Sequence, residues 1–519
     1  MTTHDSAASQ PTGFFGHPRG LMTLFLTELW ERFSYYGMRA ILVLFMTTAV
    51  ASGGLGFDAK TAGSVYAVYT SMVYLMALPG GWLADNFFGQ RRSVLYGGVI
   101  IMIGHILLAF HGLAFFYGGL FCVIIGTGLL KPNISAIVGQ LYEPGDVRRD
   151  AGFSIFYMGI NLGGFSAPLI CGWFAQSERF REMLAGWGLE PETAWHWGFA
   201  AAAVGMFFGL VQYVLTGKGL GSAGLEPANA GSPEKIARAR STAVRWSVIS
   251  LVVLGTIITL GVTAPQLMNE TNISNGFGVL LIAICVIFFA GLFLSSEWTE
   301  EERKRLILVL VLFIGASIFW GLFEQAGSTL TLFADRSTDN QILGRAFPSS
   351  WWQSMNSLMI VLLAPVFAWL WVYLGKRNPS SPAKFSVGLF FAGLGFLVLV
   401  GGANVAGDTG KASVGWLLTV YLCHSVGELF LSPVGLSSMT KLAPARVAGL
   451  MMGVWFLATS VGSFIAGKAA SFYESFEVTT LLAVIGFTGI GAAVAMGLLI
   501  KPIGTMLGGS EELALEESD

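Results

Sequence analysis

Residues 21 to 50 read LMTLFLTELWERFSYYGMRAILVLFMTTAV, an apolar run that contains only four charged side chains. A helix needs about 20 apolar residues to cross a hydrocarbon layer of about 30 Å, so this run predicts a membrane-spanning helix. Similar runs recur along the 519 residues, of which 54% are hydrophobic and 12% charged. Soluble domains carry about 25% charged residues. The sequence therefore predicts an all-α protein that crosses a membrane many times.

The apolar runs predict fourteen transmembrane helices in groups of six, two and six. Residues 217–242 are rich in Gly, Ala, Ser and Pro and predict a flexible linker after the sixth helix. The fourth span is predicted near 112–132, where Pro132 ends or kinks the helix. The other predicted parts are an N-terminal tail (1–20), two six-helix bundles (21–216 and 304–501), an inserted helix pair (243–296) and a C-terminal tail (502–519).

The distribution of basic residues predicts the orientation. Nineteen of the 29 Lys and Arg residues lie on the two termini or on the even-numbered connections between spans, and seven lie on the odd-numbered ones. Because cytoplasmic loops carry the excess of Lys and Arg, both termini are expected in the cytoplasm. We predict a multi-pass protein of the cell inner (plasma) membrane. Asp85 and Arg91, at a cytoplasmic helix end, are predicted to act in gating.

The charges of the first span share one helical face. At 100° per residue, Glu28, Glu31, Arg32, Tyr35 and Arg39 fall within a sector of about 100°. Arg32 can pair with Glu28 one turn earlier and with Glu31 beside it. A salt-bridge cluster that only locks helices together is one interpretation. A polar seam directed at a cavity is the other.

Three more ionisable residues, Lys131, Glu324 and Glu428, fall inside other predicted spans. Exposing all seven charges to lipid would cost about 20 kcal/mol, at roughly 2.5–3.5 kcal/mol each, so they must face one another or water. A central cavity between the two bundles is the simplest arrangement, because transport sites lie where two halves meet. Four acids against three bases leave one negative charge, which protonation of a glutamate removes. This favours proton coupling, without indicating which glutamate carries the proton.

The same residues predict a zwitterionic ligand. Arg39 and Lys131 suit an anionic end, and Glu428 suits a cationic end. Neutral hydrogen bonds for an amide between them are available from Asn161, Asn356, Tyr35, Tyr36 and Tyr74. A di- or tripeptide has this chemistry.

At these residues the sequence resembles the proton-dependent oligopeptide transporter family of the major facilitator superfamily, over nearly the whole chain. ELWERF is similar to the ExxERF motif of the first helix, and FYMGINLGG to the FYxxINxG signature of the fifth. GELFLSPVGLS resembles the motif of the tenth helix, and GGWLADNFFGQRR the superfamily loop after the second. The resemblance implies a major facilitator fold and proton-coupled import of di- and tripeptides by alternating access. The inserted helix pair is typical of bacterial members.

The resemblance also implies residue roles. Glu28, Glu31 and Arg32 would couple proton movement, with Glu324 as a second proton-linked acid that can pair with Arg39. Arg39 and Lys131 would bind the peptide carboxylate, and Glu428 the amino end. The remaining binding residues implied are Asn161, Asn356, Tyr35, Tyr36, Tyr74, Trp320, Ser432 and Trp455. Animal members carry a histidine on the second helix where this chain has Ala67, which moves the proton chemistry to the glutamates.

Other functions are less well supported by the sequence. Nitrate or another small anion is the alternative cargo, because the family that the sequence resembles includes carriers of such anions as well as carriers of peptides. An intramembrane enzyme would need a nucleophile with a base or clustered metal ligands, and the six histidines are scattered. A channel would be obstructed by paired charges. We therefore expect no enzyme activity, no metal, no cofactor beyond the proton gradient, no nucleic-acid partner, and a functional monomer in the lipid bilayer.

Overall fold

The computed structural model describes residues 12–143, 145–229, 232–294, 298–444, 447 and 450–506. Nearly all of this part is helical, as the sequence predicts. Eleven of its helical segments are long and apolar enough to cross a membrane. Each of the fourteen predicted spans coincides with a long helix or with a group of consecutive helical segments. The chain divides into two compact units whose boundaries differ from those of the predicted bundles. The bundle boundaries remain a prediction.

The first unit consists of Met1–Met38, Met76–Cys171 and His196–Val248. Its described elements, some of which continue into the second unit, are strands β1 (Thr12–Phe14) and β2 (His17–Pro18), helices α1 (Arg19–Thr47), α3 (Ala77–Leu83), α4 (Gln90–Leu108), α5 (Leu113–Gln140), α6 (Arg149–Gln176), α8 (Ala194–Thr216) and α9 (Pro233–Thr263), the π-helix η2 (Ala84–Phe88) and the 3-10 helix η4 (Gly217–Leu220).

The second unit consists of Arg39–Leu75, Gly172–Trp195 and Ile249–Asp519. Its further described helices are α2 (Ala59–Leu75), α7 (Glu178–Gly186), α10 (Glu270–Leu294), α11 (Glu300–Phe323), α12 (Thr329–Ser337), α13 (Ser354–Leu374), α14 (Ser381–Thr409), α15 (Val414–Leu442), α16 (Met451–Ala470) and α17 (Val478–Met506). Its short elements are η1 (Val50–Ser52), η3 (Pro191–Thr193), η5 (Pro265–Leu267), η6 (Glu324–Gly327), η7 (Ser349–Gln353), η8 (Gly375–Arg377), and strands β3 (Gln341–Ile342) and β4 (Arg345–Ala346).

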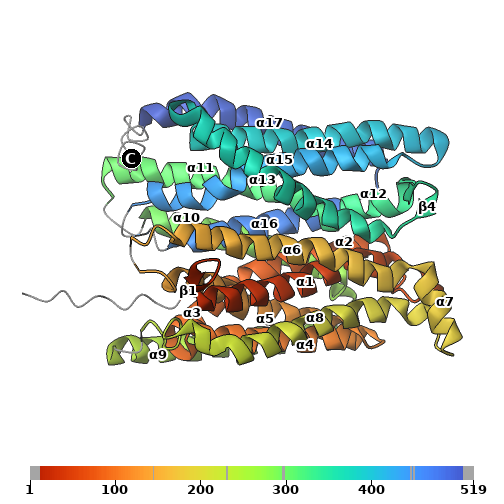
Figure 1. Ribbon diagram of the computed structural model, residues 1–519, viewed down its shortest axis with the longest axis horizontal. Coiled ribbons are helices and arrows are strands. Elements are labelled where there is room, and N and C mark those ends of the chain that lie inside the picture. Colours follow the sequence, from red (N-terminus) through yellow and green to blue (C-terminus); the bar gives the residue numbers. More distant parts are fainter. Residues whose placement is uncertain are drawn as a thin grey trace, which may run out of the picture. The chain divides into compact units, whose positions relative to one another are not determined.

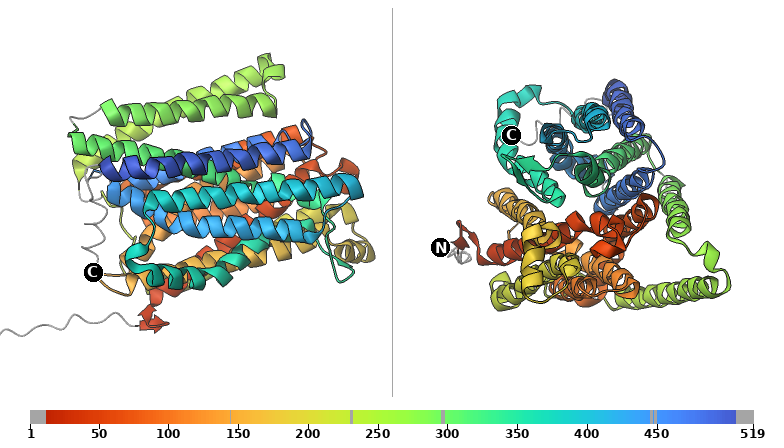
Figure 2. Two further views of the ribbon diagram at one scale, coloured as in Figure 1. Left: turned by 90° about the horizontal axis from the view of Figure 1, so that it is seen from above. Right: turned by 90° about the vertical axis from the view of Figure 1, so that its right-hand side faces the viewer.

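Glycines allow the helices of each unit to pack closely. A Cβ atom on Gly126 of α5 would lie 2.5 Å from the carbonyl oxygen of Gly97 on α4, and the reverse contact is equally short. A Cβ on Gly393 of α14 would lie 2.7 Å from the oxygen of Gly486 on α17. Figure 1 shows α14 beside α17 and α15, and the right view of Figure 2 shows the long helices end on. Small residues at helix interfaces are typical of membrane bundles.

The predicted linker is partly wrong. Residues 233–242, which its composition places in a flexible segment, form the first turns of α9. Pro233 stands at the start of the helix, where proline needs no hydrogen-bond acceptor. The Ala, Arg, Lys and Glu residues that follow are good helix formers, so a lack of apolar periodicity did not prevent helix formation.

Pro132 does not end the fourth span. Helix α5 continues through Pro132 to Gln140, eight residues beyond the predicted end. Only one backbone hydrogen bond is lost at a proline, and close packing against α3 and α4 supports the helix on both sides of it. Lys131 therefore lies within a continuous helix.

Candidate transport sites

The first unit contains a buried ionic cluster on α1. Arg32 Nε lies 3.1 Å from Glu28 Oε1 and also donates a hydrogen bond to Glu31 Oε2. All three side chains are at most 5% exposed. The second carboxylate oxygens of Glu28 and Glu31 receive no hydrogen bond from the described residues. Two carboxylates thus share one guanidinium.

Three other predicted residues lie near this cluster. The guanidinium of Arg32 lies over the rings of Tyr35 and Tyr36, at 5.4 and 5.9 Å from their centroids. Lys131 of α5 is close enough to Glu28 for their charges to interact. The two opposite charges therefore come from different helices of the first unit.

The α6 signature supports the cluster by close packing. A Cβ on Gly163 would lie 2.4 Å from the carbonyl oxygen of Leu29 and 2.9 Å from Arg32 Cβ. Gly159, one turn earlier, meets the oxygen of Phe25 in the same way. Asn161, between these glycines, is 6% exposed and donates its amide to the oxygen of Tyr157. Gly159 and Gly163 thus bring α6 against α1 at the charged residues.

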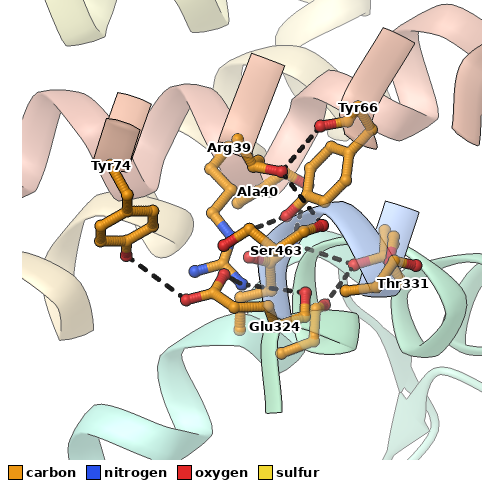
Figure 3. Close-up of polar contacts among 12 residues, drawn as sticks. Arg39, Ala40, Tyr66, Tyr74, Glu324, Thr331 and Ser463 are labelled. Atoms are coloured by element: carbon orange, nitrogen blue, oxygen red, sulfur yellow. Dashed lines mark hydrogen bonds and ion pairs between the residues drawn. The ribbon is translucent and has the colours of Figure 1, made fainter. Parts of the chain in front are cut away.

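The second unit contains a buried ion pair between Arg39 of α1 and Glu324 of η6. Arg39 Nη2 lies 2.9 Å from Glu324 Oε2, and both side chains are less than 5% exposed. Arg39 Nε donates to the hydroxyl of Tyr66 at 2.9 Å, and the hydroxyl of Tyr74 donates to Glu324 Oε1 at 3.4 Å. Figure 3 shows these two tyrosines of α2 around the pair. The structure thus contains the Arg39–Glu324 pairing that the resemblance implies.

Glycine makes room for this pair. A Cβ on Gly327 would lie 2.1 Å from the Tyr66 hydroxyl and 2.5 Å from Arg39 Nε. Ala67, at the position of the histidine of animal members, packs directly against α16. A Cβ on Gly467 of α16 would lie 2.4 Å from the Cα of Ala67. Ala67 is fully buried. A small residue at position 67 allows α2 and α16 to touch.

Glu428 of α15 forms a second polar group in this unit. Asn356 of α13 donates its amide to Glu428 Oε2 and to the hydroxyl of Ser425, each at 3.0 Å. Glu428 is close enough to Glu324 for their charges to interact. Two acids, one arginine and several neutral donors therefore lie near one another in the second unit.

Two of the predicted aromatic residues pack against each other. Trp320 of α11 and Trp455 of α16 form an edge-to-face pair with centroids 6.2 Å apart. A Cβ on Gly462 would lie 2.4 Å from Trp320 Cβ, so the Trp320 side chain starts against the α16 backbone. Ser432 of α15 is half-buried.

Asp85 and Arg91 bond to the segment after α8. The backbone carbonyl oxygen of Asp85 accepts a hydrogen bond from the backbone N–H of Asn229 at 3.0 Å. Arg91 Nη2 donates to the backbone carbonyl oxygen of Gly221 at 2.6 Å. The predicted gating pair is thus attached to residues 221–229 on both sides. Its role in gating remains a prediction.

Tyr66 is the residue that the sequence analysis missed. It lies two turns before Tyr74 on α2, with Thr70 between them at the i, i+4, i+8 spacing of one helical face. This spacing was visible in the sequence. A hydroxyl in an apolar span is a weaker signal of a functional site than a charge.

Comparison with known proteins identifies the family. The family model described as the POT family matches residues 91–488. The chain belongs to the POT family. It is 44% identical over 492 residues to the uncharacterized transporter YclF of Bacillus subtilis (strain 168), covering 95% of each chain. It is 37% identical over 504 residues to a di-/tripeptide transporter of Lactococcus lactis subsp. cremoris, covering 95% of this chain and 97% of the relative.

The fold agrees with this assignment. A crystal structure of peptide transporter POT in complex with sulfate superposes with a TM-score of 0.87 at 44% identity, covering 96% of this chain and 98% of that one. The predicted fold class, an all-α membrane protein with a major facilitator fold, is confirmed. The POT-family chain is a membrane transporter.

Proposed function

We infer that this POT-family protein imports di- and tripeptides together with protons by alternating access. The observation that carries the inference is Glu428, an acid held by Asn356 near the buried Arg39–Glu324 pair. A peptide has an ammonium group that needs an acid, whereas nitrate has none. The anion-carrier alternative therefore leaves Glu428 without a role.

Arg39 and Lys131 bind the peptide carboxylate in this proposal. When Lys131 is neutralised by the carboxylate, it no longer stabilises the charge of Glu28, and a proton then binds to the Glu28–Glu31 pair. Protonation weakens the hold on Arg32. Protonation of Glu324 releases Arg39 in the same manner, so binding and proton uptake promote each other.

The remaining roles are proposed from the family resemblance. Glu428, with Asn356 and Asn161, binds the amino end and the amide, and Tyr35, Tyr36, Tyr74, Trp320, Ser432 and Trp455 line the side-chain pockets. The proton gradient supplies the energy, so no metal or organic cofactor takes part. The protein works as a monomer in the inner (plasma) membrane with both termini in the cytoplasm, as the distribution of Lys and Arg favours.

The role of Glu428 is tested with a peptide that lacks the ammonium group. In liposomes, Glu428→Gln should raise the KM for dialanine at least ten-fold and leave the weak uptake of N-acetyl-dialanine unchanged. Glu301→Gln, which removes an exposed acid of α11, is the matched control and should change neither. Full dialanine uptake by Glu428→Gln would contradict the proposed role.

A further inference from the structure

A basic cavity lies at one end of the first unit, away from the buried charges. It encloses about 640 Å³ between the start of α1 and the end of α8, and its lining includes Arg19, Met22, Thr23, Thr216 and Lys218. The other lining residues are Phe14 and three glycines. The cavity thus contains two cationic side chains and, among its described lining residues, no carboxylate.

The backbone holds the two cations on the same side. A Cβ on Gly20 would lie 2.9 Å from the oxygen of Gly219, so the first turn of α1 touches the turn that carries Lys218. A Cβ on Gly13 of the β1–β2 hairpin would lie 2.8 Å from Arg19 Cγ. The exposed Arg19 side chain thus runs past the hairpin, and it lines the cavity.

The hydroxyls in the cavity are already bonded to protein. Thr23 Oγ1 donates to Thr216 Oγ1 at 2.9 Å, and Gln212 donates to the same oxygen at 2.8 Å. Arg19 and Lys218 form no ion pair with a carboxylate of the described residues. The charge that the cavity can still accept is therefore negative.

The surface beside the cavity is apolar. Met22, which lines the cavity, is 37% exposed, and Leu215, next to Thr216 on α8, is 75% exposed. In a transmembrane protein such side chains face acyl chains. A ligand with an anionic head and apolar tails would contact both surfaces at once. Basic pockets between transmembrane helices bind lipid headgroups for this reason.

We propose that this cavity binds the phosphate headgroup of an anionic phospholipid, with Arg19 and Lys218 on the phosphate and the acyl chains along Met22 and Leu215. The site is separate from the peptide-binding residues. A bound lipid would join α1 to α8 at the end of the first unit.

The experiment measures lipid binding to the purified full chain in detergent by native mass spectrometry. Dioleoyl phosphatidylglycerol should bind the wild type, and Arg19→Gln/Lys218→Gln should weaken its Kd at least ten-fold. Lys235→Gln/Arg240→Gln, which removes two exposed charges of α9 outside the cavity, should keep the wild-type Kd. Arg19→Lys, which keeps the charge, should lose less than Arg19→Gln.

Competition identifies the ligand. Dioleoyl phosphatidylcholine should bind at least ten-fold more weakly than phosphatidylglycerol, since its choline group repels the two cations. Inorganic phosphate at equal concentration should not displace the lipid. Equal Kd values for the wild type and the double variant, or displacement by inorganic phosphate, would overturn the proposal.

Discussion

Arg39 and Glu324 form a buried ion pair that we propose to open in response to a proton. They lie 2.9 Å apart and are nearly unexposed, and separating a buried pair leaves a charge without its partner, at a cost of about 3–5 kcal/mol. Tyr66 and Tyr74 hold the two partners from α2. The pair therefore opens readily only when Glu324 becomes neutral.

Replacement of Glu324 by glutamine should uncouple transport from the proton gradient. We expect Glu324→Gln to lower proton-driven dialanine uptake at least ten-fold, since no proton can then bind at this position. Counterflow exchange, which needs no net proton movement, should stay within about three-fold of the wild type. Glu301→Gln, which removes an exposed acid of α11, is the control for both assays. Equal losses in uptake and exchange would assign Glu324 to peptide binding instead.

Close helix contacts are the feature that matters at the scale of elements. Helix α6 meets α1 through Gly159 and Gly163, directly beside the ionic cluster of Glu28, Glu31 and Arg32. Any side chain at these positions must push the helices apart, and that displaces the charged residues as well. The glycines of the signature are thus explained by packing.

Gly163→Ala should destabilise the protein by about 1–3 kcal/mol, the usual cost of an overfilled interface. The cause is the added Cβ, which would lie 2.4 Å from the oxygen of Leu29. Gly291→Ala on α10 is the matched control, because nothing lies within 4 Å of its Cβ. Thermal unfolding in detergent should show a lower midpoint for Gly163→Ala alone. A wild-type midpoint for that variant would mean that α6 moves away freely.

A second prediction concerns the loop between α16 and α17. Partial burial raises the pKa of Glu474. The hydrogen bonds from the N–H of Ala59 at 3.0 Å and from the guanidinium of Arg336 lower it by more than burial raises it, so the pKa of Glu474 lies below the usual value. Protons therefore bind the unfolded chain first as the pH falls. The stabilisation by Glu474 is complete above the unfolded pKa of about 4.5 and is lost as the pH falls through the lower folded value.

The thermal midpoint of the wild type should consequently fall between about pH 5 and pH 3 more than that of Glu474→Gln, which has no carboxylate to protonate. Glu301→Gln, which removes an exposed acid of α11, should keep the wild-type pH dependence. Identical pH profiles for the wild type and Glu474→Gln would show that this contact does not stabilise the fold.

At the scale of the whole molecule, the prediction concerns coupling. A symporter moves protons only with its substrate, whereas a channel conducts without one. Proton flux into liposomes should therefore require added dialanine, and neutral di- and tripeptides should compete for uptake while free amino acids do not. Liposomes containing Glu324→Gln are the control for the coupled flux. Proton flux without peptide would contradict alternating access.

The sequence by itself determined the membrane-spanning helices, the family and most of the charged residues. Hydropathy is a local property, so the apolar runs could be located without knowledge of their packing. The cost of a charge in lipid likewise marks Glu28, Glu31, Arg32, Arg39, Lys131, Glu324 and Glu428 as functional candidates.

The tertiary structure decided which groups meet. Arg39 contacts Glu324 and Tyr66, from elements separated along the chain, and Tyr66 was not predicted. Helix α5 continues through Pro132 and α9 begins at Pro233 because neighbouring contacts and helix propensity outweigh the local signals. Pairing depends on helix packing through glycines such as Gly163 and Gly327. A local pattern holds no information on the distance between two side chains from different helices. Only the folded chain supplies that distance.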